Sequence, residues 1–456
     1  MAIDAFLRLI GTTVAYRLYK HIANRSIVLN SDEGAVVMGH LRCFWLFFVV
    51  LIACGVSLGQ QPGGMLLKGA ERAHFDDLRA RGGEALYNLD YEEARRLFNE
   101  IRRQFPDHPA GPHSLAATLW LQTMNESRRL QSSLYSTKSF YSKTEDKVDP
   151  KTIEAFRTHT REATMLAEAR LKSDPRDLEA LYFLGATEGL KAAFAGAVER
   201  RFMAALRSGL KSVENHRKVL KLDPTYHDAE LTIGIYDYVV GGLPLPIKLM
   251  ASLGGIGGSK KRGIQTLERV VEQGRRVSDD ARVMLIAIYK REKRYSESLN
   301  LARELAEKYP RNYLFRLEVA DALISQAAVN RKAGQAAAAN GAENEALTIF
   351  DALLRDRSIK AMARSLDLVH YRYGEALLLA GRPEQASQEF FAAASAPEAE
   401  PGLASMAYLR AAQSLDLVGK RREALSAYNT VLKRPNAYDT YNEAQRGLRN
   451  PYSTKD

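Results

Sequence analysis

Along most of the chain, a small residue is followed four positions later by an aromatic or large apolar residue, and three positions after that by another apolar residue. Ala94, Phe98 and Ile101 show this pattern, and Pro106 follows Ala94 by twelve positions. Intervals of four and seven lie on one face of an α-helix, and a proline beyond them stops the helix. Strand-like alternation of apolar and polar residues is scarce. The pattern therefore predicts an all-α protein.

The clearest repetition lies near the C-terminus, where four positions recur after a constant shift of 38 residues. The first set is Gly374, Ala386, Phe390 and Ala393, and the second is Ala412, Ala424, Tyr428 and Val431. Self-similarity at such a period is typical of stacked helix pairs. We therefore predict a right-handed α-solenoid of stacked antiparallel helix pairs. Because a solenoid offers an extended binding surface, this prediction favours a binding protein over an enzyme.

Further motifs agree with this spacing. Leu181, Leu184 and Gly185 form a first-helix motif after Pro175, and Tyr309-Pro310 ends a second helix as Asp174-Pro175 and Asp223-Pro224 do. Over roughly residues 70–450, the chain resembles the tetratricopeptide repeat family. The resemblance implies a helix-pair scaffold for protein partners, of the type found among exported bacterial proteins.

The array is expected to be irregular. The repeat anchors Ala94 and Ala163 are 69 residues apart, and Ser298 and Ala346 are 48 apart, whereas a plain array uses about 34. Long helices or insertions must therefore lie between repeats. Residues 126–150 form a polar insertion, interpreted either as a surface loop or as a flap that contacts a partner.

Residues 239–263 form a second insertion, rich in glycine, proline and apolar residues. It is interpreted either as an internal crossing buried by neighbours or as an apolar patch that meets a partner or lipid. The predicted organisation lists an extension at 1–37, a signal segment at 38–59, N-terminal helix pairs at 60–125, the polar insertion at 126–150, a solenoid at 151–450 that contains the insertion at 239–263, and a tail at 451–456.

The segment 38–59 resembles a secretory signal. A start at Met38 with Arg42 supplies a short basic region, and Cys43–Cys54 is an apolar run of twelve residues, short for a membrane span. We therefore expect an exported protein of the periplasm or cell envelope. If translation begins at Met1 instead, the apolar run becomes a signal anchor.

Two processing routes remain open at this segment. Small residues at Ser57 and Gly59 suit cleavage before Gln60, which would release a soluble protein. Alternatively, the residues that end in Cys54 resemble a bacterial lipobox, so that Cys54 would be lipidated and attach the protein to a membrane. Both cysteines of the chain lie here, which leaves the remainder without disulfides, thiol nucleophiles or cysteine-based zinc sites.

Charge and motifs give little support to catalysis or nucleic-acid binding. The formal net charge is +11, from 65 Lys and Arg against 54 Asp and Glu, but the basic residues are dispersed among acidic ones. No HExxH or GxSxG motif occurs, and Gly258 is followed by Ser259 and Lys260 rather than by the residues of a phosphate-binding loop. We therefore predict a protein with no catalytic residues, metal or cofactor.

In tetratricopeptide arrays, the first helices of the pairs line a concave groove. The resemblance therefore nominates the inward positions of these helices as partner contacts: Tyr182, Tyr238, Lys290, Arg291, Tyr371 and Gln413. Tyrosine beside lysine and arginine suits a peptide with acidic and apolar groups. We expect a scaffold for protein or peptide partners in assembly, transport or secretion. The alternative is a carrier or receptor that holds a small ligand or lipid through the insertion at 239–258.

Overall fold

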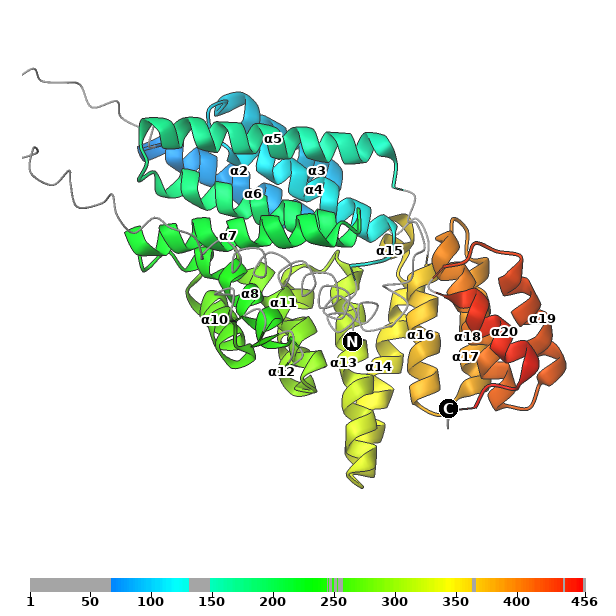
Figure 1. The fold of residues 1–456 in the computed structure, drawn as a ribbon. Coiled ribbons are helices and arrows are strands. Elements are labelled where there is room, and N and C mark those ends of the chain that lie inside the picture. Colours follow the sequence, from blue (N-terminus) through cyan, green and yellow to red (C-terminus); the bar gives the residue numbers. More distant parts are fainter. Residues whose placement is uncertain are drawn as a thin grey trace, which may run out of the picture.

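The computed structural model describes residues 67–130, 148–243, 257–362, 366–437 and 439–453, together with 245, 248, 249 and 252. These residues form mainly α-helices, and no strand occurs among them. Successive helices pack as antiparallel pairs that stack into a right-handed solenoid (Figure 1). The predicted fold class is therefore confirmed.

Most of the helices follow one another with few residues between them, and the two insertions provide the longer connections. The first half contains α2 Gly69–Tyr87, α3 Tyr91–Gln104, α4 Ala110–Glu126, α5 Pro150–Ser173, α6 Leu178–Ala197, α7 Phe202–Leu222, the short 3₁₀ helix η3 His227–Ala229, α8 Glu230–Gly241 and α10 Lys260–Gln273. The second half contains α11 Ser278–Arg291, α12 Tyr295–Lys308, α13 Tyr313–Lys332, α14 Ala336–Arg355, α15 Arg357–Met362, α16 Asp367–Leu379, α17 Pro383–Ser395, α18 Pro401–Leu417, α19 Arg421–Leu432 and α20 Thr440–Arg449.

A glycine on one helix and a ring on the next hold the most regular pairs together. In the pair α2–α3, a Cβ on Gly82 would lie 2.3 Å from the Phe98 ring, and in α16–α17 a Cβ on Gly374 would lie 2.7 Å from the Phe390 ring. Phe98 is 3% exposed and Phe390 is fully buried. The glycine therefore lets the ring pack directly against the backbone of its partner helix.

The Asp-Pro pairs that were predicted to end helices form the same local turn. Asp174 follows α5, and its Oδ1 accepts a 2.9 Å hydrogen bond from the backbone N–H of Arg176. Asp223 follows α7, and its Oδ1 accepts a 2.9 Å bond from the N–H of Thr225. The carboxylate thus accepts a hydrogen bond from the backbone N–H that follows the proline, where the helical hydrogen-bond pattern has ended.

The predicted irregularity is present. Helices α13 and α14 contain 20 residues each, and the far end of this pair projects beyond its neighbours (Figure 1). The insertion at 239–263 begins where α8 ends, at Gly241. A Cβ on Gly241 would lie 2.3 Å from the backbone nitrogen of Lys260, and one on Gly263 would lie 2.5 Å from that of Tyr238. These glycines allow the backbones of α8 and α10 to cross closely.

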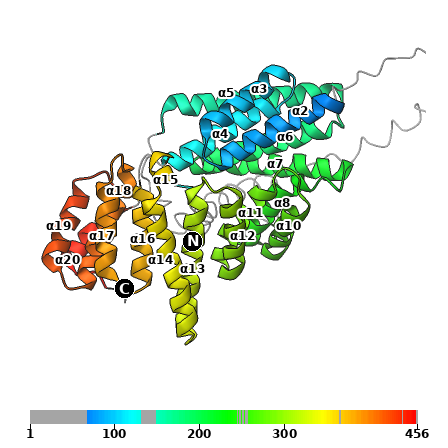
Figure 2. The same ribbon diagram turned by 180° about the vertical axis from the view of Figure 1, so that it is seen from behind.

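The solenoid bends, so that its N-terminal block lies across the ends of later helices. Helices α5, α6 and α7 run across the direction of α13, α14 and α16 in both views (Figures 1 and 2). The Tyr87 ring, at the end of α2, stacks on that of Tyr309 with centroids 4.8 Å apart. The Asn312 side chain, which caps α13, donates a 2.6 Å hydrogen bond to the carbonyl of Tyr87.

A buried ion pair fixes the same bend at α16. Arg128, just after α4, donates through Nε to Oδ1 of Asp367 at 2.9 Å, and Asp367 is fully buried. The backbone N–H of Glu400 also donates to Asp367, at 2.8 Å. One carboxylate thus joins segments that are 239 residues apart in the chain.

The signal segment at 38–59, its candidate lipidation site Cys54 and the extension at 1–37 lie outside the described residues, as do residues 131–147 of the polar insertion. Within the described ranges, no helix has both the length and the apolar character needed to span a bilayer.

Candidate functional site

The inward positions of the first helices are largely engaged by other parts of the chain. Lys290 on α11 donates to Glu318 on α13 at 2.9 Å and also to Asp321. Arg372 on α16 pairs with the same Asp321. Burial lowers the pKa of Lys290, but the carboxylates of Asp321 and Glu318 outweigh this effect and raise it. The lysine is therefore a charged bridge between neighbouring first helices.

The same arrangement continues onto α18. Arg410 donates through Nε to Glu375 on α16 at 2.6 Å and through Nη1 to Gln413 at 3.0 Å. The Glu375 carboxylate raises the pKa of Arg410. Together with Lys290, Glu318, Asp321 and Arg372, these residues form an ionic ladder across α11, α13, α16 and α18. Two predicted contact residues, Lys290 and Gln413, belong to this ladder.

The predicted tyrosines are buried. Tyr182 and Tyr371 are 6% and 3% exposed, and their rings pack against His216 and Phe390. Tyr238 is 3% exposed, and its hydroxyl donates to Glu292 at 2.7 Å. Arg291, by contrast, is half-buried at the end of α11. The structure thus does not bring the six nominated residues onto one open surface, and their contact role remains a prediction.

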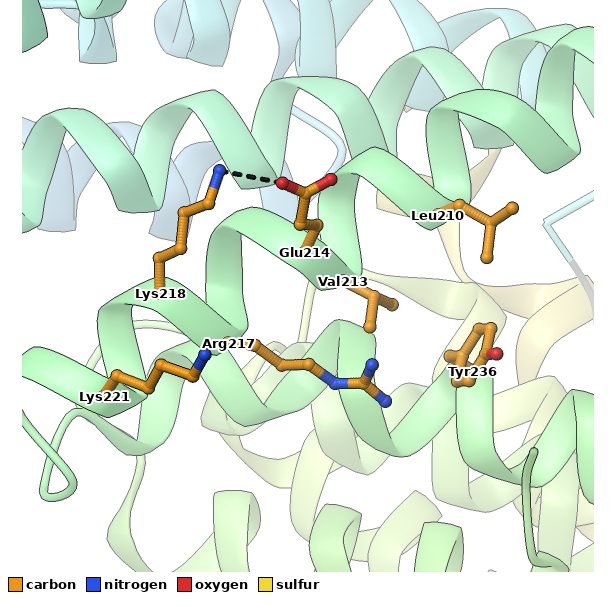
Figure 3. A pocket seen from close by; sticks show the side chains of 7 residues that line it. All are labelled: Leu210, Val213, Glu214, Arg217, Lys218, Lys221 and Tyr236. Carbon is orange, nitrogen blue, oxygen red and sulfur yellow. Dashed lines mark ion pairs between the residues drawn. The ribbon is translucent and has the colours of Figure 1, made fainter. Parts of the chain in front are cut away.

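An open hollow lies instead between α7 and α8 (Figure 3). Its volume is about 270 Å³, and it is lined by Leu210, Val213, Glu214, Arg217, Lys218, Lys221 and Tyr236. The first six residues are on α7, where intervals of three, four, seven, eight and eleven from Leu210 place them along one helical face. Tyr236, on α8, supplies the facing wall.

The floor of this hollow is apolar and its rim is basic. The Arg217 side chain extends toward Tyr236 (Figure 3), and its guanidinium carbon lies 5.8 Å from the ring centroid, a cation–π distance. Lys218 pairs with Glu214 at 2.9 Å, and their hydrogen bond lowers the pKa of that carboxyl group. The exposed Lys221 side chain makes no hydrogen bond or ion pair with any described residue. The hollow therefore offers Arg217 and Lys221 to an anionic group.

The shape of the hollow suits side chains of a partner more than an enclosed small molecule. Pockets that enclose drug-sized ligands measure about 300–1,000 Å³ and bury most of the ligand, whereas this hollow is smaller and open. A second hollow, of about 510 Å³, is lined only by residues of α3, namely Arg96, Asn99, Arg102 and Arg103. Because a single helix lines it, it is a stretch of surface rather than a cleft.

The buried histidines serve packing. His216 occupies the aromatic position of α7, against Gly185, where a Cβ would lie 2.5 Å from its ring. Its Nε2 contacts the carbonyl oxygen of Tyr182 at 3.1 Å, and burial lowers its pKa to about 4. Burial also lowers the pKa of His113 to about 4. Within the described ranges, no three His, Cys, Asp or Glu residues are grouped as metal ligands.

Comparison with known proteins identifies the repeat. The tetratricopeptide repeat family model matches residues 81–108, the segment that contains Gly82, Ala94, Phe98 and Ile101. The chain contains a tetratricopeptide repeat. The same internal spacing returns at Gly374, Ala386, Phe390 and Ala393, in the pair α16–α17.

Similar solved structures are also helical-repeat proteins. They include a human IFIT1 dimer with m7Gppp-AAAA, at 13% identity over 84% of this chain and 86% of that chain, with a TM-score of 0.43. Yeast Tom70 is 11% identical over 82% and 87%, with a TM-score of 0.35. A tetratricopeptide repeat protein from Parabacteroides merdae is 13% identical over 71% and 93%, with a TM-score of 0.29. No curated protein matches the chain. No function is transferred at this level of similarity.

The α7–α8 hollow was missed from the sequence because its signal is weak. In the sequence, the charged residues of α7 look like an ordinary solvated helix face. Only the position of Tyr236 opposite them makes them the lining of a hollow. That position depends on how α7 packs against α8, which local spacing does not specify.

Proposed function

We propose that the protein is a non-enzymatic scaffold whose α7–α8 hollow binds an acidic and apolar peptide segment of a protein partner. The observation that supports it most is the pairing of an apolar floor, at Leu210 and Val213, with the basic rim of Arg217 and Lys221. A carboxylate of the peptide would meet the rim, while a neighbouring apolar side chain would cover the floor.

The composition of the hollow favours a peptide over a nucleic acid. Single strands bind where several aromatic rings stack on successive bases along a basic groove. Here Tyr236 is the single aromatic residue of the lining, and Arg217 already lies over it.

Fluorescence anisotropy tests the proposal with the full chain. The probe is a labelled twelve-residue peptide that alternates glutamate with leucine and phenylalanine, compared with the same peptide carrying lysine for glutamate and with a twelve-nucleotide uridine RNA. We expect binding of the acidic peptide alone, weakened about tenfold by Arg217→Gln with Lys221→Gln. The matched control is Lys172→Gln with Lys332→Gln, which removes the same charge from exposed lysines on α5 and α13.

Equal weakening by both pairs of substitutions would assign the effect to net charge and contradict the site. Binding of the RNA without the acidic peptide would replace the peptide hypothesis with a nucleic-acid one. The half-buried Arg291 remains a proposed contact for a longer partner, and Arg291→Gln tests that extension in the same assay.

We also propose that the protein is exported to the cell envelope. The support is the sequence alone: the apolar run Cys43–Cys54, its basic neighbour Arg42 and the small residues before Gln60. Intact mass of the protein recovered from its own cells tests this. An N-terminus at Gln60 or a lipidated Cys54 would support export, and an intact Met1 would contradict cleavage.

A further inference from the structure

Two exposed leucines stand just beyond the end of α8. Leu245 is 75% exposed and Leu249 is 64% exposed, which is unusually high for large hydrophobic residues in the described part of the chain. The backbone is helical at both residues, which are four positions apart in the sequence. This observation favours an apolar patch over a buried crossing for this part of the insertion at 239–263.

The surrounding sequence carries only positive charge. Residues 238–267 contain no Asp or Glu and four basic residues, namely Lys248, Lys260, Lys261 and Arg262. Lys260 pairs with Glu292 at 2.7 Å, and Arg262 pairs with Asp237 at 2.7 Å through Nη2. Both carboxylates thus come from outside the stretch and neutralise two of the four cations.

The other two lysines have no carboxylate partner in the part of the chain that the structure describes. Lys248 Nζ donates only to the carbonyl of Gly241, at 3.4 Å, and exposed Lys261 makes no ion pair within the described residues. Gly241 lies against the backbone of Lys260. The start of α10, which contains Lys261, is therefore beside the end of α8, to which Lys248 donates. The patch therefore combines two exposed leucines with two unpaired ammonium groups.

We propose that this patch, defined by Leu245, Lys248, Leu249 and Lys261, docks on an anionic bilayer surface. The leucines enter the boundary between headgroups and acyl chains, and the lysines contact anionic headgroups. Lys248 lies between the leucines in sequence, and its flexible stem lets the ammonium stay at the headgroup level while the apolar groups enter. A second copy of the chain fits the patch poorly, because its own lysines would face these ones.

A depth-sensitive reporter tests the proposal in the full chain. Leu249→Trp is mixed with vesicles of seven parts phosphatidylcholine to three parts phosphatidylglycerol that contain brominated acyl chains, which quench tryptophan fluorescence on contact. The matched control is Leu379→Trp, at an apolar position on α16 that is 57% exposed. The fluorescence of the parent chain, with its native Trp45 and Trp120, is subtracted.

We expect the emission of tryptophan at 249 to shift to the blue and to be quenched, while that at 379 remains unchanged. Replacing Lys248 and Lys261 by glutamine should raise the lipid concentration at which quenching is half-maximal about fivefold per lysine. Because the apolar run Cys43–Cys54 is the same in every variant, attachment through it does not produce a difference between the two reporters.

Three outcomes would overturn the proposal. The first is equal quenching at 249 and 379, and the second is quenching at 249 that is equally strong with phosphatidylcholine alone. The third is a blue shift at 249 that grows with protein concentration without vesicles, which would assign the patch to self-association.

Discussion

Substituting Gly82 by alanine isolates the contact that defines the best-formed repeat. Alanine in the middle of a helix is ordinarily more stable than glycine by about 1 kcal/mol. At this position, however, the new Cβ would lie 2.3 Å from Cε1 of Phe98 and 2.8 Å from two further ring atoms. Carbon atoms in contact prefer about 3.5–4.0 Å, so the buried ring would have to move by more than about 1 Å.

Overpacking of this kind costs about 1–3 kcal/mol, which offsets or exceeds the gain in helix propensity. The neighbouring Gly83 provides the control, because a Cβ there meets nothing within 4 Å. We therefore expect Gly83→Ala to raise the free energy of unfolding slightly and Gly82→Ala to lower it or leave it unchanged. The difference between the two variants should be about 1–3 kcal/mol.

Equilibrium unfolding in urea, followed by far-UV circular dichroism, measures the difference directly. A second substitution, Phe98→Leu, removes the ring and should cost less in the Gly82→Ala background than in the parent chain. Equal stability of the two alanine variants would refute the packing argument, as would strictly additive effects of Gly82→Ala and Phe98→Leu.

Two further predictions concern the bend of the solenoid. Burial raises the pKa of Asp280 to about 6, and the nearby carboxylates of Asp279 and Asp228 add to this, although its hydrogen bond from the Tyr87 hydroxyl acts against it. The folded state thus binds the proton more tightly than the unfolded state. The stability of the fold therefore decreases as the pH rises from about 4 to about 6. Asp280→Asn should exceed the parent in free energy of unfolding by about 3 kcal/mol at pH 8 and by much less at pH 4. Urea unfolding at both pH values checks this, and a difference that is the same at both would contradict it. Arg128→Met leaves the buried carboxylate of Asp367 with only its other donors and should lower the free energy of unfolding by about 3 kcal/mol. Hydrogen exchange measured by mass spectrometry should become faster at the start of α16. Unchanged exchange there would contradict the role of the pair.

Much of the helix-pair scaffold could be predicted from the sequence, because the interactions that form it are local. Ala94, Phe98 and Ile101 lie on one helix, and the Asp-Pro turns close within three residues. The long intervals between repeat anchors also indicated long helices such as α13 and α14. Gly82 could have been found as well, since it precedes Ala94 by the same twelve residues that separate Gly374 from Ala386.

The site could be predicted less well, because it depends on contacts between repeats. Lys290 was predicted as a partner contact, but in the structure it pairs with Glu318 and Asp321, which belong to the next first helix. A spacing rule for one helix cannot show that the facing helix supplies the neutralising charge. The burial of Tyr238 likewise depends on the close crossing of α8 and α10.

The ion pair between Arg128 and Asp367 has a consequence for the order in which the protein folds. In a simple solenoid each repeat contacts only its neighbours, and folding can spread from any point along the array. Here the N-terminal helices leave the ribosome more than two hundred residues before the helix that receives them. Their docking surface is therefore completed late in synthesis, and the last step of folding closes a loop of that length. Because of this closure, the N-terminal helices and α16 should unfold together. The resistance of the array to partial unfolding then depends on this coupling more than on the number of repeats.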